Sequence, residues 1–104
     1  MKFQIERELF LGPLSIVTSV VERRQTLPIL ANVLISIQGK RLTLVGTDLE
    51  VEISIETEVL SGEDGQCTVT ARKLLDICRA LPETATIDFT GENDKGKLKS
   101  GRSR

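Results

Sequence analysis

Residues 49–59 read LEVEISIETEV and carry the clearest repeat in the chain. Apolar residues alternate with glutamates and a serine, so every second side chain falls on the same face of an extended strand. One face is therefore expected to pack on a core while the other meets water, as is typical of antiparallel sheets. The apolar face holds Leu49, Val51, Ile53, Ile55 and Val59, and the other holds Glu50, Glu52, Ser54, Glu56 and Glu58.

Strand signals continue on both sides of this stretch. Residues 29–37, ILANVLISI, place apolar side chains on both faces, and residues 41–46 follow after a short turn, which predicts a hairpin. Shorter strands are predicted over residues 1–5, 67–70, 86–90 and 97–104, with turns over residues 38–40, 61–66 and 91–96.

Two segments, residues 8–22 and 71–82, have the spacing of amphipathic helices. Pro13 should either kink the first helix or move its start towards Gly12, because proline lacks a backbone donor. Thr70 can cap the second helix, and Pro82 lies at its end. The expected apolar positions are Phe10, Leu14, Val17 and Val21 in the first helix and Leu74, Ile77, Cys78 and Leu81 in the second.

The order of these elements decides the fold class. Strands and helices do not alternate regularly, so a doubly wound parallel sheet is not expected. The prediction is an α+β fold in which an antiparallel sheet carries both helices on one face. At 104 residues the chain has the size of one compact domain.

Charge is unevenly distributed along the chain. The formal net charge is -1, yet residues 48–64 contain seven acids and no base, while residues 95–104 contain five bases and no acid. Such segregation allows a local basic face on a nearly neutral molecule. With no tryptophan or tyrosine and only three phenylalanines, recognition of single strands by base stacking is not expected.

Residues suited to catalysis or to metal binding are scarce. The chain has no histidine, and Cys67 and Cys78 fit neither a redox pair nor a zinc motif, so they are interpreted as reduced thiols. Ligands of a cation must converge on one point, whereas the glutamates of residues 49–59 are spread along one surface of a strand. No catalytic residue, cofactor or metal is therefore expected. No apolar run reaches a membrane span and no secretory signal is present, which favours a cytoplasmic protein.

The outer face of the second helix is open to two interpretations. Arg72, Asp76 and Arg79 share one stripe at intervals of four and three residues. A solvated face explains this stripe, with Asp76 paired to an arginine one helical turn away. Alternatively, the arginines contact the phosphates of a nucleic acid duplex, and Arg23 and Arg24 could add to that contact.

Several stretches, taken in order and spacing, resemble the bacterial sliding clamp family, the beta subunit of DNA polymerase III. They are residues 26–30 (TLPIL) with Asn32, residues 46–50 (GTDLE), residues 71–82 and residues 100–104 (SGRSR), together with Met1, Lys2 and Phe3. The match extends over essentially the whole chain and is specific to the amino-terminal domain of that family. Pro13, Gly96 and Lys97 depart from the residues expected there.

The resemblance implies a fold and a function. Clamp subunits contain three copies of one α+β domain, and two subunits pair head to tail into a ring around duplex DNA. This ring tethers the replicative polymerase, while catalysis resides in another subunit. Residues 1–104 would then be the first clamp domain, ending within its last strand, with the second and third domains absent. Polymerase III subunits and the clamp loader would bind through those absent domains.

The resemblance also implies roles for single residues. Arg24, Arg72 and Arg79 are expected to face duplex DNA, without sequence preference. At the joint with a second clamp subunit, Lys73, Arg102 and Arg104 are expected to meet acids, with Leu74 and Ile77 as apolar support. An alternative is a stand-alone module that pairs with a clamp subunit through an exposed edge strand. Tight independent binding of DNA is not expected, because one domain supplies only about two or three phosphate contacts.

Overall fold

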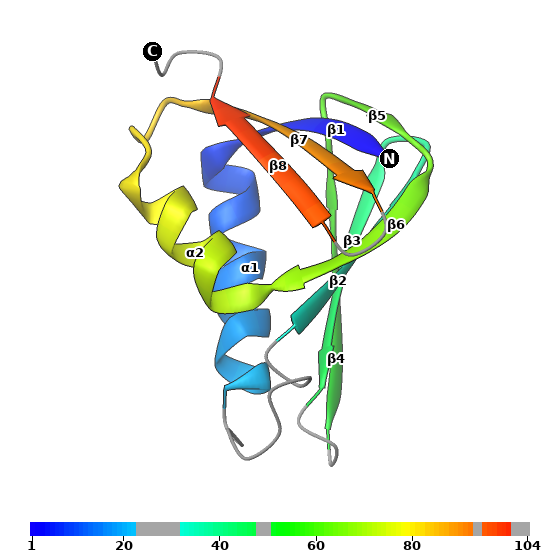
Figure 1. The fold of residues 1–104 in the computed structure, drawn as a ribbon, viewed down its shortest axis with the longest axis vertical. Coiled ribbons are helices and arrows are strands. Elements are labelled where there is room, and N and C mark those ends of the chain that lie inside the picture. The colour runs from blue at the N-terminus through cyan, green and yellow to red at the C-terminus, as the bar shows by residue number, and fades with distance from the viewer. Residues whose placement is uncertain (23–31, 48–50, 93–94, 101–104) are drawn as a thin grey trace.

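The computed structural model describes residues 1–22, 32–47, 51–92 and 95–100 (Figure 1). Two helices and the strands of two antiparallel sheets make up this part of the chain, which confirms the α+β class. The elements are β1 (Lys2–Glu6), α1 (Arg7–Val21), β2 (Asn32–Gln38), β3 (Arg41–Thr47), β4 (Glu52–Glu58), β5 (Ser61–Glu63), β6 (Gly65–Thr70), α2 (Ala71–Ala80), β7 (Thr86–Glu92) and β8 (Lys95–Ser100).

The strands divide between two sheets rather than forming one. The first sheet has the order β5-β1-β7-β8 and the second has the order β4-β3-β2-β6, with antiparallel pairs throughout. The periodicity of a strand shows which face each residue occupies, but it does not show which other strands lie beside it. The division of the strands between two sheets could therefore not be predicted from the sequence. β5 lies in a stretch expected to be a turn, and its strand character comes from pairing with β1.

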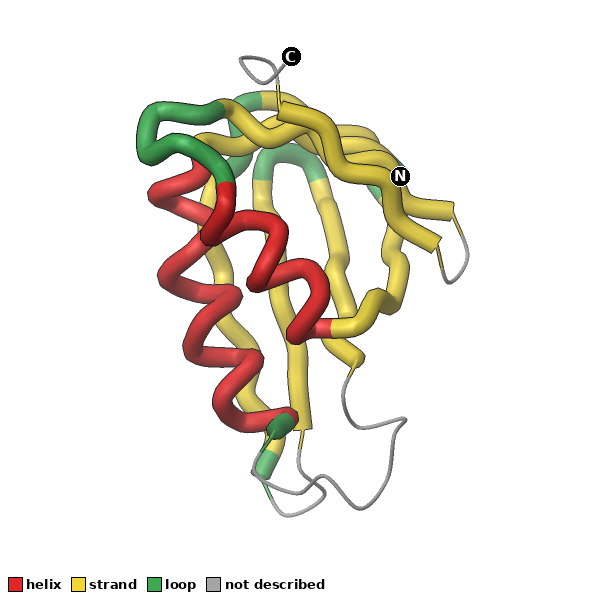
Figure 2. Tube along the Cα trace, turned by 60° about the vertical axis from the view of Figure 1, so that its left-hand side comes forward, coloured by secondary structure: helices red, strands yellow, loops and turns green. Residues whose placement is uncertain are grey.

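The two helices pack next to each other, and both cover the same face of the sheet that contains β2, β3 and β4 (Figure 2). Helix α1 packs on β3 and β4, and α2 packs on α1 and β6. Every apolar position predicted for α1 is buried, as are Val33, Ile35 and Ile37 of β2. The ring of Phe3 stacks on that of Phe89 with centroids 5.0 Å apart and meets Phe10 edge-on at 5.8 Å.

Helix α1 begins at Arg7 and continues through Pro13. A start near Gly12, one of the two alternatives expected from the proline, is therefore wrong. Six buried side chains anchor α1 on the sheet and on α2, which offsets the hydrogen bond that Pro13 cannot donate. The expected hairpin is present as β2 (Asn32–Gln38) and β3 (Arg41–Thr47), with the turn glycine Gly39 at φ 64°, while residues 29–31 of the expected strand lie outside the described residues.

The close approach of β3 to α1 depends on Gly46. A Cβ atom at this position would lie 2.6 Å from Cγ1 of Val17 and 2.7 Å from Cγ1 of Val21. Carbon atoms at van der Waals contact are about 3.5–4.0 Å apart, so a side chain at Gly46 would force the helix away from the sheet.

Helix α2 is rotated slightly from the predicted orientation. Its buried residues are Ala71, Leu74, Leu75 and Cys78, whereas Ile77 is 48% exposed. The core stripe therefore runs through Leu75 and not through Ile77, and the prediction for Ile77 as a core residue is wrong. The packing of α2 against both α1 and β6 selects this face from two adjacent apolar stripes. Thr70 occupies the N-cap position in an extended conformation, without a side-chain capping hydrogen bond.

Candidate nucleic-acid interface

The outer face of α2 gathers the charged residues that the sequence singled out. Because Ala71, Leu74, Leu75 and Cys78 are buried, the rotation of the helix about its axis is set. The residues between them consequently face solvent, and they are Arg72, Lys73, Asp76, Ile77 and Arg79. This arrangement agrees with both interpretations of the stripe.

The guanidinium group of Arg72 connects the start of α2 to the end of α1. Its Nε donates to Oε2 of Glu22 at 2.9 Å, and Nη2 donates to Oε1 of the same carboxylate at 2.5 Å. Glu22 is the C-cap residue of α1. A third contact, from Nη1 to Oδ1 of Asp76 at 3.4 Å, is the ion pair expected within the helix.

This cluster shifts the protonation equilibria of both partners. Hydrogen bonds from Arg72 lower the pKa of Glu22, and the charges of Arg72 and Arg79 add to the effect, while partial burial opposes it. The same hydrogen bonds raise the pKa of Arg72, so both groups are ionised at neutral pH. The side chain of Arg72 is 46% exposed and that of Glu22 is 23% exposed, so an approaching phosphate can reach the arginine.

A second arginine connects the opposite ends of the helices. Arg7, the first residue of α1, donates from Nε to the carbonyl of Cys78 at 2.9 Å and from Nη2 to that of Arg79 at 3.4 Å. These carbonyls belong to the last turn of α2, where a helix leaves acceptors unpaired and favours a cation. Sequence reasoning singled out neither Arg7 nor Glu22, because their partners are 71 and 50 residues away and no periodicity links them.

The other predicted site residues fall into three groups. Arg79 and Lys73 are exposed on α2, and Ile77 lies beside them on the surface. Leu74 is 5% exposed and belongs to the core. It can therefore support an interface only by packing under the exposed residues of α2, not by contacting a partner directly. Outside the described residues lie Arg23, Arg24, Arg102 and Arg104.

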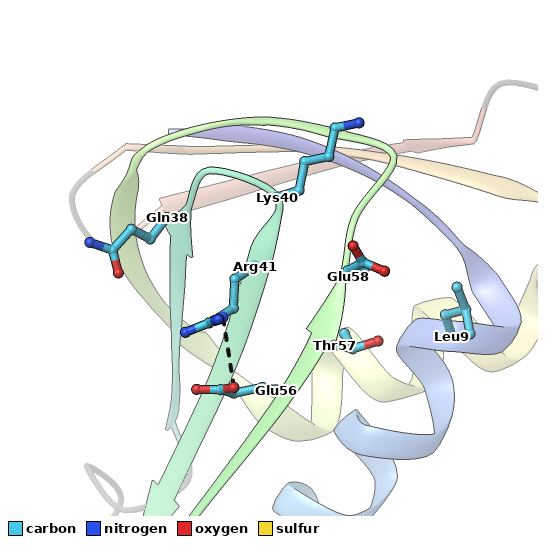
Figure 3. Close-up of a pocket in the computed structure, with 7 residues that line it drawn as sticks. All are labelled: Leu9, Gln38, Lys40, Arg41, Glu56, Thr57 and Glu58. Carbon is cyan, nitrogen blue, oxygen red and sulfur yellow. Dashed lines mark ion pairs between the residues drawn. The ribbon is translucent and has the colours of Figure 1, made fainter.

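A solvent-exposed hollow lies away from this helix face. It has a volume of about 800 Å³ and is open to solvent, with Leu9 contributed by α1 and the remaining lining residues by β2, β3, β4 and the β2–β3 turn (Figure 3). Arg41 and Glu56 form an exposed ion pair at 3.8 Å there. Glu52, Glu56 and Glu58 of β4 are all exposed, in agreement with the solvated face predicted for residues 49–59.

No group of three or more potential metal ligands occurs among the described residues. Cys67 and Cys78 are both buried, and burial raises the pKa of Cys78 to about 12, which makes this thiol a poor nucleophile at neutral pH. Within the same residues, no helix is long and apolar enough to cross a membrane.

Known proteins resemble this chain over its whole length. Residues 1–104 match the family model described as DNA polymerase III beta subunit, N-terminal domain. Beta sliding clamps of Pseudomonas putida and Pseudomonas aeruginosa are 52% and 53% identical to it, over 100% of this chain and 29% of each relative. A crystal structure of the DNA polymerase III subunit beta from Pseudomonas aeruginosa superposes with a TM-score of 0.90 at 50% identity, covering 100% of this chain and 28% of that one.

The chain thus spans less than a third of the length of the relatives that it matches. The agreement nevertheless covers both sheets and both helices, at a sequence identity that leaves no doubt about common ancestry. By sequence and by fold, this chain belongs to the family of the amino-terminal domain of the DNA polymerase III beta subunit.

Proposed function

We propose that this chain serves as the first domain of a sliding clamp, a ring around duplex DNA that tethers the replicative polymerase in the cytoplasm. The observation that carries the proposal is family membership over residues 1–104, combined with the exposed arginines of α2. In this role the chain is a processivity element, and DNA synthesis belongs to another subunit. A second clamp subunit, polymerase III subunits and the clamp loader are the proposed protein partners.

The chemistry of α2 suits a contact that must hold DNA and still let it slide. Arg72 and Arg79 can reach phosphates, which are the same at every base pair and carry no sequence information. Each phosphate neutralised by an arginine releases counterions, so the strength of the contact depends on the salt concentration. Arg24 is proposed as a further member of this surface.

The DNA contact is tested by replacing one arginine at a time. Arg72→Gln and Arg79→Gln should each weaken binding of the chain to a duplex of mixed sequence, measured by fluorescence anisotropy at low salt. The slope of log K against log salt concentration should become shallower by at most about one for each arginine lost. Arg41→Gln is the matched control, because Arg41 is also exposed and ion-paired but lies on β3. Equal affinities for all three variants would contradict the proposed surface.

The subunit joint is a separate part of the proposal. Lys73 and Ile77 are exposed on α2 and Leu74 supports them from the core, while Arg102 and Arg104 are proposed to meet acids of the partner. Charged pairs at the rim of an interface set orientation and association rate more than affinity. Lys73→Glu should therefore slow association with a clamp partner, measured by surface plasmon resonance, while Lys40→Glu on the β2–β3 turn should not.

A second candidate function is a stand-alone module that pairs with a clamp subunit. The observation in its favour is the position of β8 at the edge of the β5-β1-β7-β8 sheet. An edge strand can pair with another chain through its main-chain groups. Size-exclusion chromatography with an intact clamp of Pseudomonas aeruginosa tests this function, and no co-elution at micromolar concentration would contradict it.

A further inference from the structure

Glu22 holds Arg72 in the way that a phosphate would hold it. Its two oxygens accept hydrogen bonds from Nε and Nη2, the parallel donor edge with which arginine also binds phosphate groups. The edge of Arg72 best suited to a DNA backbone is therefore already occupied by a carboxylate of the same chain. Asp76 takes only one contact, from Nη1 at the longer distance of 3.4 Å.

We propose that Glu22 is a competitor for the phosphate-binding edge of Arg72, so that duplex DNA engages this arginine only by displacing the Glu22 carboxylate. The proposal rests on the proposed DNA contact of α2 and adds a residue that controls its strength. Glu22 does not itself contact DNA. It affects DNA binding only through its hydrogen bonds to Arg72.

The geometry allows this exchange. Arg72 is 46% exposed, so a phosphate can approach it without moving the core. Asp76 lies on the same helix as Arg72 and can keep the side chain extended along α2 after Glu22 is released. Arg79 is exposed on the same helix as Arg72, and its charge adds to the lowering of the Glu22 pKa, so the same charge would also favour a phosphate at this position.

The exchange also has a consequence for affinity. A phosphate that binds Arg72 replaces one charge-assisted pair with another, so the net gain is smaller than for a free arginine. A weak, readily reversed contact is what a protein sliding along DNA requires. Removing the competing carboxylate should therefore make the contact tighter.

The test compares Glu22→Gln with Glu56→Gln in the full 104-residue chain. Both substitutions remove one negative charge from a glutamate paired with an arginine, but Glu56 pairs with Arg41 on the β3–β4 surface. Binding to a mixed-sequence duplex is measured by fluorescence anisotropy at low salt. Glu22→Gln should tighten binding about two- to fivefold, and Glu56→Gln should change it clearly less. Equal affinities of the two variants, or weaker binding by Glu22→Gln, would overturn the inference.

Two further measurements separate this inference from the proposed function. In an Arg72→Gln background, the gain from Glu22→Gln should disappear; a gain that persists would overturn the inference. Without DNA, Arg72 should react faster with phenylglyoxal in Glu22→Gln than in the unaltered chain, with Arg41 as the internal control in peptide mass spectrometry. An unchanged rate would overturn the inference alone, whereas no DNA binding by any variant at low salt would contradict the proposed DNA contact of α2 and the inference together.

Discussion

The two ends of the helix pair are each closed by an arginine, yet the partners of the two arginines differ. At one end, Arg7 donates to main-chain carbonyls of the last turn of α2. At the other end, Arg72 donates to the carboxylates of Glu22 and Asp76. Main-chain carbonyls of a helix neither titrate nor move aside, whereas carboxylates titrate and can be exchanged for another anion. The first end is thus built for stability and the second for exchange.

The apolar contacts between the two ends should outweigh both arginines. Leu75 of α2 is 2% exposed, so Leu75→Ala should lower the free energy of unfolding by about 2–5 kcal/mol through lost burial and a residual cavity. The matched control is Ile77→Ala on the same helix, where Ile77 is 48% exposed and the change should stay within about 0.5 kcal/mol. Urea denaturation followed by circular dichroism measures both, and similar losses would show that α2 is not packed as described.

Replacing Arg7 should have the next largest effect. Arg7→Met keeps the apolar stem but leaves the carbonyls of Cys78 and Arg79 without this donor, and it should cost about 1–2 kcal/mol. Arg72→Met should cost less, because the hydrogen bonds that Arg72 makes to Glu22 and Asp76 are exposed to water. Urea denaturation of the two variants tests the comparison directly. If Arg72→Met lowered the free energy of unfolding more than Arg7→Met, the Arg72 contacts and not the Arg7 contacts would be the ones that stabilise the fold.

Alkaline pH should affect the Arg7 end through Cys78. Burial raises the pKa of this thiol from 9.0 to about 12, opposed in part by the charge of Arg7. The fold therefore favours the neutral thiol, and stability is complete below pH 9 and falls as the pH rises towards 12. Compared with Cys78→Ala, the unaltered chain should lose up to about 1 kcal/mol more per pH unit in that window. Parallel pH profiles would contradict this expectation.

Acidic pH should affect the Arg72 end, with the smallest expected change. The hydrogen bonds from Arg72 lower the pKa of Glu22 below its ordinary value of 4.5. The stabilisation is therefore present above pH 4.5 and is lost as the pH falls through the lower pKa of the folded chain. Glu22→Gln should lack this pH dependence, and the difference from the unaltered chain should shrink with added salt. Thermal unfolding at several pH values measures it, with Glu56→Gln as the control.

Local sequence patterns predicted most of the elements but not their assembly. The alternation around Ile53 and Ile55 and the helical spacing from Phe10 to Val21 were sufficient for β4 and α1. The short strand β5 carries no such pattern, because its strand conformation depends on hydrogen bonds to β1 rather than on burial. For the candidate site, Arg72 and Arg79 were found from their spacing, whereas Glu22 was not.

What the chain specifies locally and what its folding adds can be separated for this protein. Periods of two and of about 3.6 residues determine which side chains face the core, since they follow from backbone geometry alone. The partners of Arg7 and Arg72 depend instead on how α1 and α2 lie against each other, and that is decided by burial of both helices against the sheets. Side-chain contacts across 50 to 71 residues arise only when the chain is compact, so the competition at Arg72 is a property of the tertiary structure.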